Sequence, residues 1–407
     1  MRDALGPRPP GTFPGIPPGS ILGYCTNVHA GATFGQVKAN LERYALPVKA
    51  EVSPERPMGV GLWLSADAMQ EVIEQDLAPG FRDWLGERGL LPYTFNGFPF
   101  DDFHQPVVKD KVYLPHWADG DRYAYTLGLA SILAELLPDG GEGSISTLPI
   151  GWPASFCDSP DAYATQARGA ADQLLKLVHT LARIELDTGK HLHIDLEPEP
   201  GCVLESAAGV VEFFERYLLG GPDDVSVLGY LRVCHDVCHS AVMFEEQAEA
   251  LATYRQSGIK VGKAQLSSAV RVPFGEMDAD TRGDAWQQLG SFCEDRYLHQ
   301  TSIRTDDGRV NSYVDLPQAM ADHDNAPEDG EWRVHFHVPI HLDTFDSIQT
   351  TRHEIGNYLN AIQPGDETNH FEVETYAWDV LPEPLRVDDL AAGIAAELRS
   401  VITGYSR

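Results

Sequence analysis

The stretch HLHIDLEPEPG, residues 191–201, alternates apolar and ionisable side chains and then breaks off in two prolines and a glycine. Successive side chains of a β-strand point to opposite faces. The stretch therefore predicts a strand with an apolar face of Leu192, Ile194 and Leu196 and a polar face of His193, Asp195 and Glu197. Pro198 ends the strand directly after Glu197, because proline cannot continue a hydrogen-bonded ladder. Such a strand indicates helices on its apolar face and a polar site at its C-terminal end, as in α/β barrels.

Similar short strand candidates recur along the chain, and stretches of helical period separate them. The eight candidates are 21–29, 59–64, 91–98, 144–149, 192–197, 228–236, 260–267 and 371–378. This alternation of strand and helix predicts an α/β fold, specifically a (β/α)8 TIM barrel. An open doubly wound sheet is the alternative, but no Gly-rich phosphate loop follows the first strand as that fold would require.

One further strand candidate, Trp332–Leu342, falls outside the eightfold count. It lies in a long insertion, at about residues 273–345, between the seventh and eighth barrel strands, and we expect this insertion to cover the site. Residues 1–20 are rich in proline and glycine and predict an N-terminal extension. Residues 21–407 are then expected to form one barrel domain, since α/β barrels commonly reach this length.

The composition excludes some classes of protein. Sixty-one acidic residues against thirty basic ones give a formal charge of −31, which repels nucleic-acid phosphates and anionic lipid surfaces. The sequence contains no run of 18 uncharged apolar residues, the length that would predict a membrane-spanning helix. The N-terminus also has no apolar signal core. We therefore expect a cytoplasmic protein that binds neither nucleic acid nor membrane.

The six cysteines are scattered through a long chain and predict free thiols, not a disulfide framework. Cys234 and Cys238 lie in the motif CHDVCH, for which a zinc knuckle is the alternative interpretation. A second Cys/His pair at the usual spacing is missing from the sequence.

Polar residues gather where the predicted strands end. Glu197, Asp236 and Glu374 are carboxylates at the ends of three strands, and His239 follows Asp236 in an Asp-x-x-His motif. Burying ions is costly, so carboxylates facing a barrel axis favour a site over structural ion pairs. Other candidates for the site or its substrate are Asn27, His29, Asn96, Lys263, Gln265, Arg271, and the histidines of the insertion, His335, His337 and His341. Lys263 fits equally an interior ion pair or an anionic substrate group.

The strand-end set of Glu197, Asp236 with His239, Gln265 with Arg271, and Glu374 resembles the xylose-isomerase-like TIM barrels. More narrowly, the blocks at 22–29, 40–48, 95–100, 196–202 and 236–245 are similar to EboE-type metabolite-traffic proteins of bacterial gene clusters. The narrower resemblance implies a place in secondary metabolism, with other proteins of the same gene cluster as partners and a homo-oligomer as a further expectation.

The broader resemblance, through its epimerase branch, implies that Glu197, Asp236 and Glu374 bind a divalent metal, and that His239 and Arg271 contact substrate. Gln265 stands where that branch has histidine, and its amide oxygen suits a hard cation. His337 would supply the missing imidazole. The metal stays open among Mn, Mg, Zn and Fe.

These patterns predict a metal-dependent isomerase or epimerase of a small polar metabolite, with Glu197 and Glu374 as acid and base. Asn27, His29, Asn96 and Lys263 would then help to bind the substrate. Two alternatives remain open: a metal-dependent phosphoesterase or multinuclear iron oxidase, and a protein that binds or transfers a metabolite without converting it.

Overall fold

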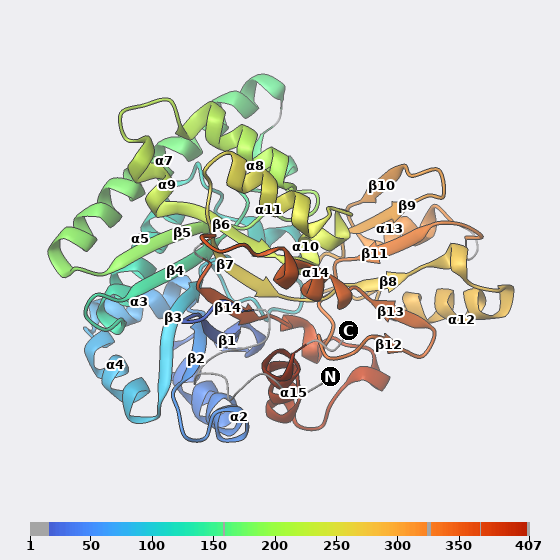
Figure 1. Ribbon diagram of the computed structural model, residues 1–407, viewed down its shortest axis with the longest axis horizontal. Helices are drawn as coiled ribbons and strands as arrows, with labels where there is room; N and C mark the ends of the chain where they lie inside the picture. The colour runs from blue at the N-terminus through green and yellow to red at the C-terminus, as the bar shows by residue number, and fades with distance from the viewer. Residues whose placement is uncertain (1–15, 158, 324–326, 367, 405–407) are drawn as a thin grey trace.

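Eight parallel strands close into a barrel in the computed structural model of the chain, which describes residues 16–157, 159–323, 327–366 and 368–404 (Figure 1). The ring runs from β1 through β7 in chain order, and β14 completes it by pairing with both β7 and β1. The strands are β1 Ile21–Cys25, β2 Met58–Leu62, β3 Leu90–Asn96, β4 Glu142–Thr147, β5 His191–Leu196, β6 Leu231–Asp236, β7 Val261–Leu266 and β14 His370–Val373. Each overlaps a strand expected from sequence, and the predicted (β/α)8 TIM barrel is confirmed.

Helices cover the outside of the barrel (Figure 1). They are α1 Phe34–Asn40, α2 Leu46–Val52, α3 Ala66–Glu74, α4 Ala78–Glu87, α5 Gly120–Leu136, α6 Pro153–Phe156, α7 Pro160–Thr188, α8 Ala207–Phe213, α9 Asp224–Tyr230, α10 Val237–Val242, α11 Gln247–Gln256, α14 His353–Ala361 and α15 Leu390–Thr403, with α12 Ala279–Gly290 and α13 Leu316–Ala321 in the insertion. No helix among the residues described is long and apolar enough to cross a membrane.

Helix α7 shows how local sequence sets these elements. The Ser159 side chain accepts a hydrogen bond from the backbone N–H of Ala162 and caps the helix start. Gly189 ends the helix at φ +72°, a left-handed conformation that glycine adopts without strain. Between these ends, side chains at helical spacing are buried against the barrel: Ala167, Ala170, Ala171, Leu174, Leu177, Val178 and Leu181.

The insertion between β7 and β14 forms a second sheet of six strands, which lies beside the barrel on the right of Figure 1. Its strands are β8 Val270–Val272, β9 Thr301–Arg304, β10 Val310–Tyr313, β11 Glu331–Val334, β12 Thr344–Phe345 and β13 Ile348–Thr350. The predicted strand 332–342 is too long. The backbone leaves the sheet after Val334, where the N–H of Phe336 bonds to the carbonyl of Val334, and then runs back towards the barrel, where the N–H of Val338 bonds to the carbonyl of Ser268.

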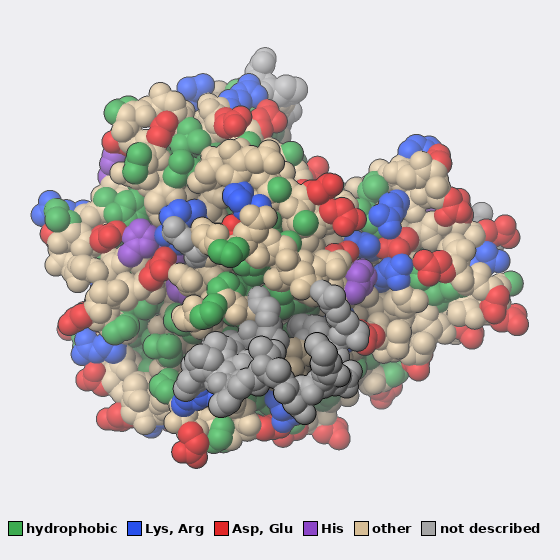
Figure 2. All heavy atoms as spheres, in the orientation of Figure 1, with side chains coloured by type: hydrophobic (Ala, Val, Ile, Leu, Met, Phe, Trp, Pro, Cys, Tyr) green, Lys and Arg blue, Asp and Glu red, His purple; other side chains and the backbone are tan. Residues whose placement is uncertain are grey.

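Most of the predicted N-terminal extension, residues 1–15, lies outside the described residues. Asp and Glu side chains are spread over the barrel and the second sheet on the face seen in Figure 2. This agrees with the formal charge of −31.

The barrel interior is polar in successive layers, where α/β barrels usually pack branched apolar side chains. Low in the barrel, the rings of His193 and His370 stack with centroids 5.7 Å apart. Above them, Lys263 Nζ lies 2.6 Å from Glu372 Oε2, and both side chains are fully buried. An unpaired charge is costly at such a buried position, so Lys263 and Glu372 neutralise each other within the barrel.

Gly61 of β2 makes room for this ion pair. A Cβ atom at residue 61 would lie 1.3 Å from Glu372 Oε1, so any side chain there would displace the carboxylate. The glycine is therefore required by the close approach of Glu372.

We expect Gly61→Ala to lower the free energy of unfolding by about 1–3 kcal/mol, the usual cost of overpacking a filled interior. Urea denaturation followed by circular dichroism measures this change. Gly86→Ala is the matched control, because nothing lies within 4 Å of a Cβ at that position of α4, and it should leave stability equal or slightly higher. Equal stabilities of the Gly61→Ala and parent proteins would show that Glu372 is not held tightly.

Candidate active site

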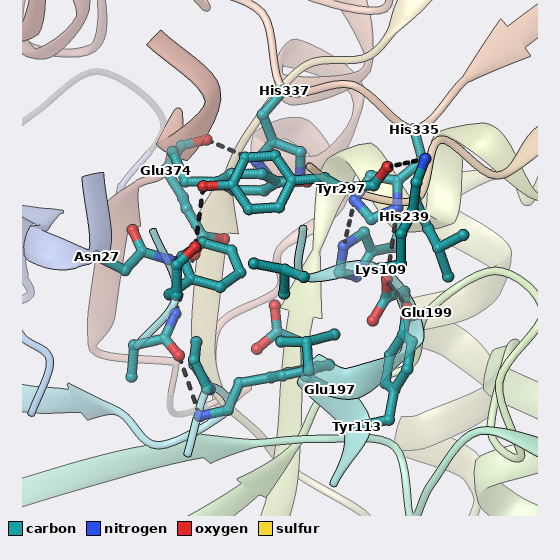
Figure 3. A pocket seen from close by; sticks show the side chains of 18 residues that line it. Asn27, Lys109, Tyr113, Glu197, Glu199, His239, Tyr297, His335, His337 and Glu374 are labelled. Carbon is teal, nitrogen blue, oxygen red and sulfur yellow. Dashed lines mark hydrogen bonds and ion pairs between the residues drawn. The ribbon is translucent and has the colours of Figure 1, made fainter. Parts of the chain in front are cut away.

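A pocket opens at the C-terminal ends of the barrel strands (Figure 3). The polar side chains that line it include Asn27, Asn96, Glu197, Glu199, His239, His335, His337 and Glu374. Aromatic rings form much of its wall, among them Phe98, Phe103, Tyr297 and Tyr376. The insertion that follows β7 supplies His335, His337 and Tyr297 to this pocket.

Carboxylates from three barrel strands converge here: Glu197 and Glu374 line the pocket, and Asp236 is buried next to them. Oxygens of Glu197, Asp236 and Glu374 all lie within 4.8 Å of one another, and the three side chains are buried. The backbone N–H of Glu197 bonds to Thr147 O at 3.0 Å, so the residue leaves β5 while still held against β4. The structure thus brings together the three residues that the sequence places at strand ends.

Hydrogen bonds hold one oxygen of Asp236 and one of Glu374 and leave others free. Asp236 Oδ1 accepts from the backbone N–H of His239 at 2.9 Å and from Ser267 Oγ at 2.7 Å, while Oδ2 has no partner. Glu374 Oε1 accepts from the amides of Asn27 at 2.7 Å and Asn96 at 2.9 Å. Glu197 Oε2 is buried and has no hydrogen-bond partner.

His337 and Gln265 add two further ligand groups. His337 Nδ1 lies 2.9 Å from the carbonyl of Glu374, which can only accept, so the ring proton is on Nδ1 and Nε2 carries a lone pair. That Nε2 is unpartnered and lies 4.0 Å from Asp236 Oδ2. Gln265 is fully buried in register between Asp236 and Glu372, and neither atom of its amide has a partner.

Burial and mutual repulsion perturb the acidity of the cluster. Burial first, then Asp236 and Glu372, raise the pKa of Glu374 to about 8. Burial and the charges of Glu374 and Asp236 likewise raise the pKa of Glu197 well above its usual range. Burial also acts against ionised Asp236, but His239, His337 and its two hydrogen-bond donors outweigh it and lower its pKa. Burial lowers the pKa of His337 to about 4, so its ring is neutral at physiological pH.

A divalent cation fits this set of groups. Buried polar atoms normally find partners, yet Glu197, Asp236, Gln265 and His337 each keep at least one buried atom without a partner. Carboxylate, amide and neutral imidazole are metal ligands, and a cation among them would remove the repulsion that raises the pKa values. The cluster is thus a candidate metal site, whose ion the ligands alone do not specify.

Three predicted substrate-binding residues do not line the pocket. A 3₁₀ turn at Thr26–Val28 follows β1 and carries His29 away, where it bonds to Tyr24 and stacks on Tyr44. Lys263 is paired with Glu372 below the site. Arg271 lies on β8 in the second sheet, hydrogen-bonded to Gln349 and Glu331, because the chain has left the barrel by then.

Glu199 and Tyr113 line the pocket and Gln300 bonds to both, and the sequence patterns do not single out these three residues. Glu199 Oε1 accepts from Tyr113 Oη at 2.7 Å and from Gln300 Nε2 at 3.1 Å. The signal for Glu199 was its place in the Pro-Glu-Pro turn, which holds a second acid beside Glu197. Tyr113 and Gln300 come from loops distant in sequence and have no such signal.

The cysteines are all free thiols, as expected. Among the described residues, Cys238 groups with His335 and His337, but Cys234 belongs to no cluster with metal-ligating geometry. The zinc-knuckle alternative, which needs both thiols, therefore has no geometric support.

No family model and no curated relative matches the chain. The chain is similar to a number of solved structures, among them the following three. The probable 3-DHS dehydratase AsbF of Bacillus anthracis is 11% identical, with coverage of 95% of this chain and 100% of that one and a TM-score of 0.47. The IOLI protein with a binding zinc atom is 11% identical, with coverage of 95% and 99% and a TM-score of 0.48. A xylose isomerase domain containing protein of Salmonella typhimurium is 11% identical, with coverage of 94% and 96% and a TM-score of 0.40. At such values the likeness carries no inference about activity, which rests on the site itself.

The perturbed Glu374 carboxyl makes stability depend on pH when no metal is bound. Its folded-state pKa of about 8 lies above the ordinary value of 4.5, so the folded state holds its proton more tightly. The resulting stability is fully present below pH 4.5 and is lost as the pH rises through 8. For chelator-treated protein we expect the free energy of unfolding to fall by a few kcal/mol across this window.

Chemical denaturation at a series of pH values, with and without Mn²⁺, measures this slope. Glu374→Gln should flatten it, and added metal should do the same by favouring the ionised carboxylate. A slope unchanged by Glu374→Gln would show that other groups cause it.

Proposed function

We propose that this protein is a metal-dependent isomerase or epimerase that moves a proton on a small hydroxylated or keto compound. The observation that carries the proposal is the convergence of Glu197, Asp236 and Glu374 within 4.8 Å, with Nε2 of His337 at 4.0 Å from Oδ2 of Asp236. These two residues, with Gln265 and the two glutamates, would hold the ion. A bound divalent cation would supply Lewis-acid polarisation of a substrate oxygen.

Glu197 and Glu374 are suited to transfer the proton. They approach the pocket from β5 and β14, so a substrate carbon between them would meet one carboxyl on each side. A general base works best when its pKa lies near the working pH, and burial moves Glu374 in that direction. Asn27 and Asn96 hold one oxygen of Glu374, which fixes the orientation of the other oxygen.

The remaining walls would position the substrate and exclude water. Phe98, Phe103, Tyr297 and Tyr376 offer flat apolar faces to the carbon skeleton of a small molecule. Exclusion of water strengthens the electrostatic interactions within the pocket. A role in metabolite traffic or secondary metabolism is supported by the sequence blocks that resemble EboE-type proteins.

Proton transfer in deuterium oxide tests this proposal. Metal-loaded protein is incubated with a panel of ketoses, aldoses and hydroxyketones, and NMR follows deuterium entering at the carbon beside the carbonyl. We expect exchange with at least one compound, and Glu197→Gln or Glu374→Gln to slow it by about 100-fold or more, the usual contribution of a general acid or base.

Glu249→Gln, an exposed carboxylate on α11, is the matched control and should leave the exchange rate unchanged. Metal content and circular dichroism of each variant separate lost chemistry from lost metal or lost fold. Should a panel compound bind and stabilise the protein with no exchange or conversion, the protein binds its metabolite without transforming it, and the catalytic proposal fails.

A further inference from the structure

Two imidazole rings face each other beside the carboxylate cluster. His239 Nε2 and His335 Nε2 lie 3.1 Å apart, and both rings are buried in the pocket wall (Figure 3). The rings are almost perpendicular, at 81°, with centroids 4.6 Å apart. His239 follows β6 of the barrel, and His335 follows β11 of the insertion. The pair therefore forms where the insertion packs against the barrel.

Hydrogen bonds fix the proton of each ring on the far nitrogen. His239 Nδ1 lies 2.9 Å from the carbonyl of Pro198, which can only accept. His335 Nδ1 lies 2.7 Å from Gln300 Oε1. The orientation of that amide is set in turn, because Gln300 Nε2 donates to Glu199 Oε1 and Tyr113 Oη. Both Nδ1 atoms therefore carry hydrogen.

The two Nε2 atoms consequently direct lone pairs at each other. Facing lone pairs repel, and the contact becomes favourable when one proton or one metal ion lies against both nitrogens. Metal–nitrogen bonds of about 2.0–2.1 Å put two imidazole nitrogens of one ion about 2.8–3.4 Å apart, for angles at the ion between a right angle and the tetrahedral angle. The observed 3.1 Å falls within this range.

A third ligand stands beside the pair. Ligand atoms of Glu199, His239 and His335 all lie within 4.8 Å of one another, and all three residues are buried. Lys109, the pocket's cationic side chain, is already bound to Asp315 and to the carbonyls of Glu294 and Tyr297. Lys109 therefore does not neutralise the group.

We propose that Glu199, His239 and His335 form a second metal site beside the carboxylate cluster. Two imidazoles and one carboxylate suit a borderline transition ion such as Zn²⁺ or Fe²⁺ and leave a coordination position open to the pocket. The carboxylate cluster, richer in oxygen, suits a harder ion such as Mn²⁺. The inference rests on the proposed function only in taking that cluster as the first site, since the two ligand sets share no residue.

Metal stoichiometry tests the second site. Full-length protein is freed of metal with a chelator, dialysed, and titrated with Zn²⁺ or Mn²⁺ by calorimetry, with elemental analysis of the product. We expect two Zn²⁺ per chain for the parent protein and one for His335→Ala or His239→Ala. Asp236→Asn should instead weaken the other ion, by at least tenfold in Kd for Mn²⁺.

His116→Gln is the matched control, a buried histidine that does not line the pocket, and should retain both ions. Circular dichroism shows whether each variant folds. Anomalous scattering at the zinc edge from crystals of the parent protein adds a readout that needs no variant, with one peak expected beside His239 and His335.

The outcomes separate the two proposals. A single Zn²⁺ that survives His335→Ala and His239→Ala, with no anomalous peak at the pair, would overturn the second site. Two Zn²⁺ in the parent protein, one in each histidine variant, and a Kd for Mn²⁺ unchanged by Asp236→Asn would support the second site and contradict the carboxylate cluster as the first.

Discussion

Glu197, Asp236 and Glu374 bring three carboxylate groups within 4.8 Å of one another in a buried pocket. Like charges at that separation repel strongly where water does not screen them. The chain contains a cation in the barrel, Lys263, but that lysine is bound to Glu372 below the cluster. Charge in the upper layer has to be balanced by protons or by an ion, and this requirement sets the chemistry of the pocket.

The lower layers of the barrel support this arrangement. The Lys263–Glu372 pair fills the middle of the barrel, and the absence of a side chain at Gly61 leaves room for Glu372. Around the cluster, Asn27 and Asn96 hold Glu374, while Ser267 and the helix start at α10 hold Asp236. Hydrogen bonds therefore hold two of the three carboxylates, Asp236 and Glu374, in place against their repulsion, which is the preorganisation that a catalytic or binding site needs.

Much of the barrel and part of the site could be predicted from sequence, because both depend on periodicity. The alternation of apolar and polar residues predicts that the Glu197 side chain points to the barrel axis. The prolines that follow Glu197 predict that it lies at the C-terminal end of its strand. Alternation does not predict which buried groups pair with each other. The sequence patterns therefore do not decide between an interior ion pair and a substrate contact for Lys263, whereas the structure pairs it with Glu372. Alternation also gives no prediction where a regular strand ends. His29 follows a 3₁₀ turn and points away from the pocket, and Arg271 lies on β8 of the second sheet instead of in the barrel. The contacts of Gln300 and Tyr113 with Glu199 join distant loops, and no local pattern encodes them.

The position of β14 has a consequence for how the protein is made. This strand pairs with β1 at one edge and β7 at the other, so the ring stays open until residues 370–373 have left the ribosome. Contacts between such distant segments form slowly, because a long loop must close first. Glu374 directly follows this last strand. The three carboxylates therefore come close together, and repel one another fully, only when β14 closes the barrel. A cation bound to the carboxylates during this step would reduce their repulsion and favour closure of the barrel.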